Sequence, residues 1–286
     1  MSTNVLPPKN RKVLVTAALP YSNNRPHVGH LGGAYIPADT YVRYLRMTGA
    51  DVRFVCGSDD HGVALMITAE KEGRSPAEVA NYYREKQGQD FAGMGISFDI
   101  YSGTSTCPLH HEESQQFFKS MFDKGFFEKQ SSRQFFDEAR SAFLPDRYVK
   151  GECGFCGTAD QNGDQCENCG KILDVDSLKN ARSTLSGELA VVKETVHWFL
   201  DLSKFGAQVE RWLETAKVRE QTKAYVKGLL STGLVKRAMT RDISWGIPVP
   251  LDDAEAKGKV LYVWFDAPIG YVSFTKELCE REGSGA

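Results

Sequence analysis

The strongest constraint on the fold is a group of four cysteines within 17 residues. They form two Cys-x2-Cys pairs separated by nine residues: Cys153, Cys156, Cys166 and Cys169. Each pair makes a tight knuckle, and two knuckles supply four thiolates in the tetrahedral geometry that suits Zn²⁺ at about 2.3 Å per bond. The alternative, four unliganded or redox cysteines, rarely gives this paired spacing in a loop rich in Gly and Asn. Because protein atoms fill all four positions, we predict one zinc that is structural and not catalytic.

The other three cysteines, Cys56, Cys107 and Cys279, are scattered along the chain, so the total of seven is odd. The N-terminal stretch Met1–Arg11 is polar and has no apolar signal-peptide core. Both features favour a reducing compartment, and we predict a cytoplasmic protein. No apolar run approaches the ~20 residues of a membrane span, so a membrane is not an expected partner.

Length and composition are those of a globular protein of about two domains, at ~150 residues per domain. The 286 residues are 41% hydrophobic and 25% charged, which excludes a disordered chain, a coiled coil and a disulfide-dense miniprotein. The net charge of −2 argues against a strongly basic, non-specific nucleic-acid binder.

The first 56 residues predict one parallel βαβ unit. Residues 12–19 form a short, almost continuously apolar run that is rich in β-branched side chains, as in a strand that is buried on both faces. Residues 27–47 carry apolar side chains at helical spacing and end at Gly49. A second strand follows at 51–56.

Further elements fit the same fold class. Ser75, Pro76 and Glu78 form a capping box that opens a helix to about Gly93. Another helix is expected over 107–124, a long amphipathic pattern covers about 204–230, and 260–265 resembles a buried strand that leads into a helix.

We therefore predict an α/β fold, in which a Rossmann-like nucleotide-binding domain with a parallel sheet is interrupted by a connective insertion that carries the zinc knuckle. The expected boundaries are 1–125 for the first part of the catalytic domain, 126–240 for the insertion, and 241–286 for a return to the catalytic domain that ends early.

A histidine pair opens the first predicted helix, as His27-Val28-Gly29-His30. In an open α/β sheet, ligands bind beyond the carboxyl ends of the strands, where a helix N-terminus attracts phosphate. Two imidazoles three residues apart share one side of a helix, and Gly29 between them allows a ligand to come close to the backbone. The spacing alone leaves three interpretations open: a nucleotide-phosphate site, two surface histidines, or a metal pair.

Several segments, in order, carry a family resemblance. They are Ala18-Leu19-Pro20-Tyr21 with Pro26–His30, Cys56–Gly62, Phe143–Arg147, Arg241-Asp242 with Trp245-Gly246, and Val263–Tyr271. The histidine segment resembles the His-Ile-Gly-His signature of class I aminoacyl-tRNA synthetases, with Val28 in place of Ile. The set as a whole, over residues 12 to about 280, resembles the methionyl-tRNA synthetase family.

The resemblance implies a reaction: L-methionine and ATP, with Mg²⁺, give methionyl-adenylate, and the methionyl group then passes to tRNA(Met). It implies that His27 and His30 are catalytic, that His27, Gly29, His30 and Arg241 bind ATP, and that Asp59 holds the substrate ammonium. It further implies a methionine pocket made of Leu19, Tyr21, Asp59, Trp264, Ala267, Pro268 and Tyr271. Such a pocket suits a thioether, which packs well against aromatic edges.

Two alternatives stay open: another class I synthetase, such as one for Leu, Ile, Val or Cys, and a non-catalytic zinc-bearing fragment that binds tRNA or protein. The family also carries a Lys-Met-Ser-Lys-Ser loop and an anticodon-binding domain, and neither is present in these 286 residues. We therefore expect the first part of a longer enzyme, with doubtful activity of its own. The Gly-Ser-Gly ending fits a fragment, and the sequence gives no oligomeric state.

Overall fold

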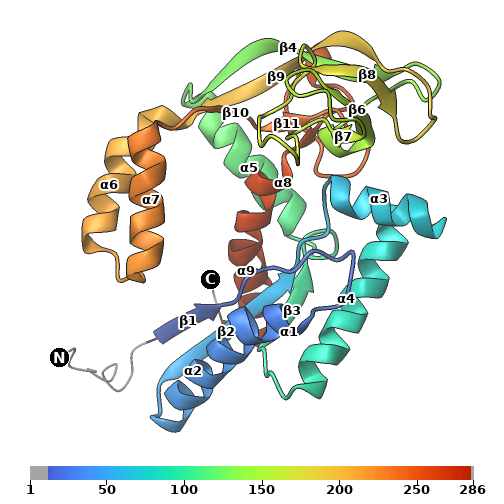
Figure 1. The fold of residues 1–286 in the computed structure, drawn as a ribbon. Helices are drawn as coiled ribbons and strands as arrows, with labels where there is room; N and C mark the ends of the chain where they lie inside the picture. Colours follow the sequence, from blue (N-terminus) through green and yellow to red (C-terminus); the bar gives the residue numbers. More distant parts are fainter. Residues whose placement is uncertain (1–11, 285–286) are drawn as a thin grey trace. The chain divides into compact units, whose positions relative to one another are not determined.

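A computed structural model describes residues 12–284, which form two compact units (Figure 1). Within this range the first unit contains residues 12–117, 245–247 and 263–284, and the second contains 118–244 and 248–262. Met1–Arg11, for which we predicted no signal-peptide core, and the last two residues of the chain lie outside the described residues. Among residues 12–284, no helix is both long enough and apolar enough to cross a bilayer.

The first unit contains a three-stranded parallel sheet in the order β1 (Lys12–Thr16), β2 (Asp51–Ser58) and β3 (Ile100–Gly103). Val13 pairs with Val52, and Val55 with Ile100. The predicted parallel arrangement of the first two strands is thereby confirmed, and their carboxyl ends meet at one edge of the sheet.

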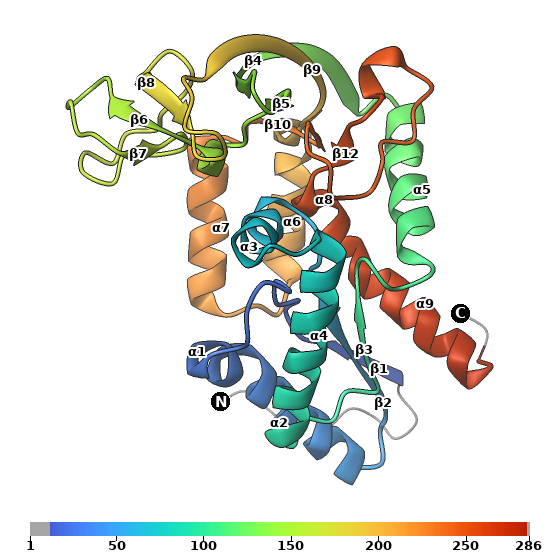
Figure 2. The same cartoon turned by 90° about the vertical axis from the view of Figure 1, so that its right-hand side faces the viewer.

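Helices cover both faces of this sheet (Figures 1 and 2). The helical segments that lie wholly or partly in the first unit are α1 (Val28–His30), a π-helical turn (Leu31–Tyr35), α2 (Ile36–Met47), α3 (Val63–Glu72), α4 (Pro76–Gly93), α5 (His110–Asp123), α8 (Val263–Asp266), a 3₁₀ turn (Ala267–Ile269) and α9 (Gly270–Glu282). Helix α5 leads from the first unit into the second.

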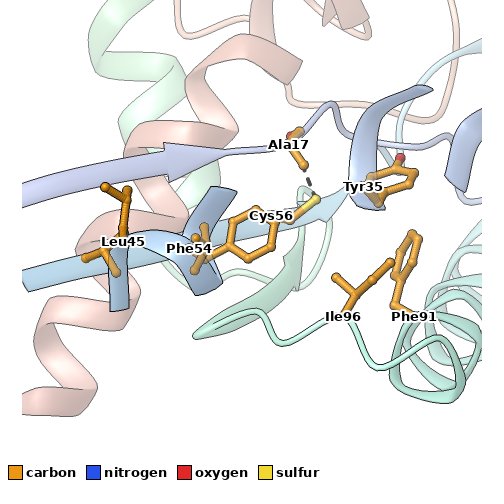
Figure 3. Packing of buried hydrophobic residues seen from close by; sticks show 9 residues of the cluster. Ala17, Tyr35, Leu45, Phe54, Cys56, Phe91 and Ile96 are labelled. Carbon is orange, nitrogen blue, oxygen red and sulfur yellow. Dashed lines mark hydrogen bonds between the residues drawn. The ribbon is translucent and has the colours of Figure 1, made fainter. Parts of the chain in front are cut away.

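The two faces of β2 pack against different helices. Phe54 and Cys56 lie in a core cluster with Leu45 of α2 and Phe91 of α4 (Figure 3). Val55, between them, belongs to a second cluster with Phe274 and Leu278 of α9. This alternation follows from the two-residue period of a strand. Gly57 is required on the α9 face, because a Cβ there would lie 2.4 Å from the Phe274 ring.

The capping box at α4 is confirmed. The backbone N–H of Glu78 donates to Ser75 Oγ over 3.3 Å, and that of Ser75 donates to Glu78 Oε2 over 2.8 Å. The helix after the first loop is confirmed too, as α1, the π-helical turn and α2 in succession, and Gly49 follows it with a φ of +78°. The helix expected over 107–124 begins three residues later, at His110.

Two strand predictions were wrong. The first strand is not buried on both faces: β1 lies at the edge of the described sheet, and Leu14 is 51% exposed while Val13 and Val15 face the core. The strand expected over 260–265 is only β12 (Val260–Leu261), and the next four residues form helix α8. A short apolar run fits a strand and a buried helical turn equally well, so its pattern could not separate the two.

The second unit is built largely from antiparallel strands. One sheet has the order β10-β9-β4-β5 (Lys236–Ala238, Val191–Asp201, Phe127–Asp137, Ala142–Phe143). A second has the order β7-β6-β8 (Gln161–Asn162, Val149–Cys153, Leu178–Ser183), and β11 (Thr240–Arg241) pairs with β12. Three short 3₁₀ turns cover Asp146–Tyr148, Leu202–Phe205 and Ala254–Ala256. The amphipathic stretch at 204–230 is two helices, α6 (Gly206–Thr215) and α7 (Glu220–Thr232).

Candidate active site

Asp59 directly follows β2 at the carboxyl edge of the parallel sheet. Its backbone N–H donates to Pro20 O over 2.8 Å, and Ser22 N–H donates to Asp59 O over 3.0 Å, so the loop after β1 is bound to the end of β2. The residue is 6% exposed, and its Oδ1 is buried without a hydrogen-bond partner among the described residues. Burial, together with the nearby charges of Asp266 and Asp60, raises the pKa of Asp59 well above its usual value. This carboxylate is therefore a site that a cation would stabilise.

The predicted pocket residues all lie in the first unit, and several gather around Asp59. Tyr21 forms an isolated parallel bridge with Asp59. Leu19 packs on the α9 side of the core, and a Cβ on Gly270 would lie 3.1 Å from its Cδ2. Burial raises the pKa of Tyr271, and the nearby negative charge of Asp59 raises it further. The structure thus brings a carboxylate, two tyrosines and a leucine to one edge of the sheet.

The remaining pocket candidates lie just before Tyr271 in the same segment. Ala267 is buried, Pro268 is exposed, and the indole of Trp264 is 64% exposed. An indole usually buries most of its large apolar surface, so Trp264 offers area that a ligand could cover.

His27 and His30 build the start of the first long helix together. His27 caps it: its Nδ1 accepts from Gly29 N–H over 3.0 Å, and the Nδ1 of His30 accepts from His27 N–H over 3.2 Å. Their rings stack with centroids 3.8 Å apart, and both residues are exposed. Because each Nδ1 is an acceptor, the proton of each neutral ring is on Nε2, which leaves two side-chain N–H donors at the start of the helix. This arrangement suits an anion.

Gly29 is needed for this cap. A Cβ at this position would lie 2.9 Å from Cε1 of His27, so the imidazole can close over the backbone only where a side chain is missing. Gly29 is therefore needed for the helix cap itself, in addition to the close approach of a ligand to the backbone that the sequence suggested.

Arg241 lies in the second unit. Its Nη1 donates to Ala238 O over 2.7 Å and to Thr240 O over 2.8 Å, and the guanidinium stacks 3.9 Å from the centre of the Tyr262 ring. Burial lowers the pKa of Arg241. All these contacts are made within the second unit, so a role of Arg241 in ATP binding stays a prediction.

The four clustered cysteines form two knuckles of the same geometry. In the first, Gly157 N–H donates to Cys153 O over 2.8 Å; in the second, Gly170 N–H donates to Cys166 O over 2.9 Å. Both glycines have a φ of +72°, which a side chain would strain. The knuckles face each other, with all four sulfurs within 4.8 Å of one another.

The sulfur spacing fits a tetrahedral metal. Cys153 Sγ lies 3.8 Å from Cys169 Sγ, and Cys156 Sγ lies 3.6 Å from Cys166 Sγ. Four sulfurs bound at about 2.3 Å to one zinc would be about 3.8 Å apart. The hydroxyl and backbone N–H of Thr158 lower the pKa of Cys156 to about 6, whereas the neighbouring thiols raise the pKa of Cys169 to about 11, so the fit to a metal rests on the sulfur spacing.

Comparison with known proteins gives the family. A family model described as class I tRNA synthetases (M) matches residues 13–286. The chain belongs to this family. Methionine–tRNA ligase of Chlorobaculum tepidum is 49% identical over 275 residues, which are 96% of this chain and 39% of the relative. The ligase of Porphyromonas gingivalis is 48% identical over 271 residues, or 94% of this chain and 39% of the relative.

A solved structure supports the fold. Methionyl-tRNA synthetase of Mycobacterium tuberculosis, bound by methionyl-adenylate, matches with a TM-score of 0.68 at 24% identity, over 97% of this chain and 50% of that one. The predicted Rossmann-like α/β fold is thereby confirmed. The chain spans about 39% of the length of the curated relatives named above.

The structure also contains buried polar clusters that the sequence did not predict. In the first unit, His61 of the loop after β2 contacts Asp266 at the end of α8, with Nδ1 and Oδ2 2.5 Å apart. His110 of α5 lies beside them, with its Nε2 3.9 Å from the same oxygen. The advance signals were that His61 belongs to the motif Cys56–Gly62 and Asp266 to the motif Val263–Tyr271.

A second cluster stabilises the second unit around Asp242. Its Oδ2 accepts from Thr195 Oγ1 over 2.7 Å and lies 3.1 Å from His197 Nε2, while Lys259 Nζ donates to Oδ1. Burial alone would raise the pKa of this carboxyl, but the hydrogen bonds from His197, Lys259 and Thr195 lower it to about 2.

We expect Asp242→Asn to lower the free energy of unfolding by about 2–3 kcal/mol at pH 7. The folded pKa lies below the unfolded one, so the stabilisation is present above about pH 4 and is lost as the pH falls towards 2. Urea unfolding followed by circular dichroism at several pH values measures both effects. The matched control Asp176→Asn breaks an exposed pair with Arg133 and should change stability by less than about 0.5 kcal/mol. Equal losses in the two variants would contradict this account.

Proposed function

We propose that this chain carries the methionine and ATP sites of a methionine–tRNA ligase. The whole enzyme would activate L-methionine with ATP to methionyl-adenylate and pass the methionyl group to tRNA(Met). The observation that carries the proposal is Asp59: a buried carboxylate, with one oxygen that lacks a partner, at the ligand-binding edge of a class I synthetase sheet. A primary ammonium has three N–H donors and one positive charge, which is what this oxygen lacks.

The proposed methionine pocket surrounds that carboxylate with apolar and aromatic groups. Its members are Leu19, Tyr21, Asp59, Trp264, Ala267, Pro268 and Tyr271. An apolar, polarisable thioether packs favourably against such rings and cannot use a polar pocket. Asp59 would fix the amino end of the substrate, and the aromatic groups would select its side chain.

ATP would lie against the start of the first long helix. We propose that His27 and His30 are catalytic and that Gly29 and Arg241 complete the ATP contacts, with Mg²⁺ arriving on the nucleotide. Attack by the methionine carboxylate on the α-phosphorus releases pyrophosphate, and charge grows on the phosphoryl oxygens in the transition state. N–H donors fixed near those oxygens stabilise that charge without reorganising, so catalysis is positioning plus electrostatics.

Titrating L-methionine and ATP separately into the chain tests this proposal. Calorimetry should give one saturable site for each ligand. A chain that binds neither would favour the alternative of a non-catalytic zinc-bearing fragment, and it would overturn the proposal.

His30→Ala should separate the two sites. The substitution removes one Nε2–H donor and one acceptor of the helix cap. We expect ATP affinity to fall by about tenfold or more, because a lost hydrogen bond to a charged group costs about 1.5–3 kcal/mol. Methionine affinity should stay within about twofold, because Asp59 lies on a different strand end. The same calorimetric titrations measure both, and equal losses for the two ligands would indicate a folding defect.

We further propose that Cys153, Cys156, Cys166 and Cys169 hold one zinc ion. The ion would crosslink two loops that have little core of their own, and with four thiolates it would keep no open position for catalysis. Tight binding of zinc by reduced cysteines agrees with a cytoplasmic location, which we include in the proposal.

A further inference from the structure

Three of the six histidines of the chain gather around one carboxylate, that of Asp266. His61 Nδ1 lies 2.5 Å from Asp266 Oδ2, and the two side chains are 3% and 1% exposed. His110 Nε2 lies 3.9 Å from the same oxygen, and the ring of His111 lies 5.6 Å from that of His61. A buried charge is stable only when it is paired or hydrogen-bonded, and here histidines make the pairing.

The cluster also ties helices α5 and α9. His110 Nδ1 lies 2.9 Å from Ser273 Oγ, and that hydroxyl lies 3.1 Å from Ile269 O. Because the hydroxyl donates its one proton to the carbonyl, it accepts from His110, whose proton is then on Nδ1. The start of α5 and the first turn of α9 are thus joined to the same buried group.

These contacts form a hydrogen-bonded cluster and not a metal site. A metal bound at about 2.0–2.1 Å keeps its nitrogen and oxygen ligands about 3 Å or more apart. The 2.5 Å separation of His61 Nδ1 and Asp266 Oδ2 is a hydrogen-bond distance instead. One shared proton accounts for it.

The cluster joins the two halves of the proposed methionine site. His61 comes two residues after Asp59, while Asp266 lies between Trp264 and Ala267. The His61–Asp266 contact therefore connects the loop of the ammonium partner with the segment of the pocket wall, across 205 residues of sequence.

Two carboxylate oxygens without a hydrogen-bond partner lie in the same region. Four buried side-chain nitrogen or oxygen atoms lack a partner among the described residues, and two of them are Asp59 Oδ1 and Asp266 Oδ1. Both carboxylates are more than nine-tenths buried. Burial and the charges of Asp266 and Asp60 raise the pKa of Asp59 well above its usual value, so the ionised form of Asp59 favours a cation beside it. The pKa of Asp266 is lowered despite its burial, because histidines hydrogen-bond to it.

We propose that Asp266, held by His61, is a positioning residue that fixes the methionine-pocket wall relative to Asp59. This inference rests on the proposed function, because the His61–Asp266 contact can position a methionine pocket only if the chain binds methionine there. Without the tie, the wall segment and the ammonium partner would still fold but would no longer be held at the spacing that methionine needs. A misplacement of about 1 Å can cost about a hundredfold in enzyme function.

Two substitutions of His61 test the geometry. The amide nitrogen of Asn lies near the position of Nδ1, and that of Gln lies near Nε2. His61→Asn should therefore keep the bond to Asp266 and keep the methionine dissociation constant within about threefold, while His61→Gln and Asp266→Asn should raise it at least about tenfold. Asp39→Asn is the control: Asp39 is a buried carboxylate of the first unit that accepts from Ser97 N–H over 2.9 Å, and its loss should affect stability but not methionine affinity.

Nuclear magnetic resonance of the histidine side chains provides a readout without ligand. The hydrogen-bonded Nδ1 proton of His61 should be visible in the wild type and His110→Ala, and absent in Asp266→Asn. If the wild type binds methionine but lacks this signal, or if His61→Asn and His61→Gln weaken binding equally, the positioning role is overturned while the proposed function stands. If the wild type does not bind methionine, the proposed function fails and the positioning role fails with it.

Discussion

Asp59→Asn should lower the affinity for L-methionine by about a hundredfold or more, because loss of one partner of a buried charge pair costs about 2–5 kcal/mol or more. The same substitution should leave the fold intact and make it more stable at pH 7. The pKa of Asp59 is raised in the folded chain, so the ionised carboxylate destabilises that state above the unfolded pKa, and the cost grows as the pH rises towards the folded pKa. A neutral isostere removes this cost.

A ligand pair makes this experiment specific. The methionine analogue 4-(methylthio)butanoate has the thioether and the carboxylate but no ammonium group. We expect Asp59→Asn to bind this analogue as well as the wild type does, within about threefold, or more tightly. Equal losses for methionine and its analogue, or a lower midpoint of thermal unfolding, would mean that Asp59 serves the fold and not the ammonium.

Removing the metal should have the second largest effect. Apparent binding free energies of structural zinc are about 10–16 kcal/mol in small zinc-binding peptides, and much of that is folding free energy. We expect one zinc per chain, and we expect strong chelation or Cys153→Ser to expose β6, β7 and the two knuckles to rapid hydrogen exchange. The parallel sheet β1-β2-β3 should stay protected, because its core clusters contain none of the four ligands.

Cys279→Ser is the matched control for this experiment. Cys279 lies in α9 of the first unit and contributes nothing to the cysteine cluster. The variant should keep one zinc and the exchange pattern of the wild type. Carefully purified wild-type protein with almost no metal, or knuckles that stay protected after chelation, would contradict a structural zinc.

Local signals allowed part of this structure to be predicted from sequence. The capping box at Ser75 involves residues three positions apart, and the four knuckle cysteines lie within seventeen residues. Both features were found as expected. Strand β2 is apolar on both faces, so its buried position and its parallel partner could be predicted as well.

Features that depend on distant partners could not be predicted. Strands β4 and β9 have eleven residues each and pair along ten positions, yet residues 128–134 of β4 are all polar and gave no strand signal. Residues 263–266 are apolar enough for a strand but form a helix, which carries Asp266 to His61. Sequence reasoning therefore identified the motif segments as candidates but not the buried contacts between them.

Calorimetric titration of one chain with a panel of amino acids tests the central claim most directly. A pocket of aromatic and apolar groups beside Asp59 should bind L-methionine at a single saturable site. L-leucine and L-isoleucine should bind at least about tenfold more weakly, since a differing apolar side chain is worth about 1–3 kcal/mol. Equal affinity for the three amino acids, or tighter binding of leucine or isoleucine, would contradict a methionine site and favour another class I synthetase.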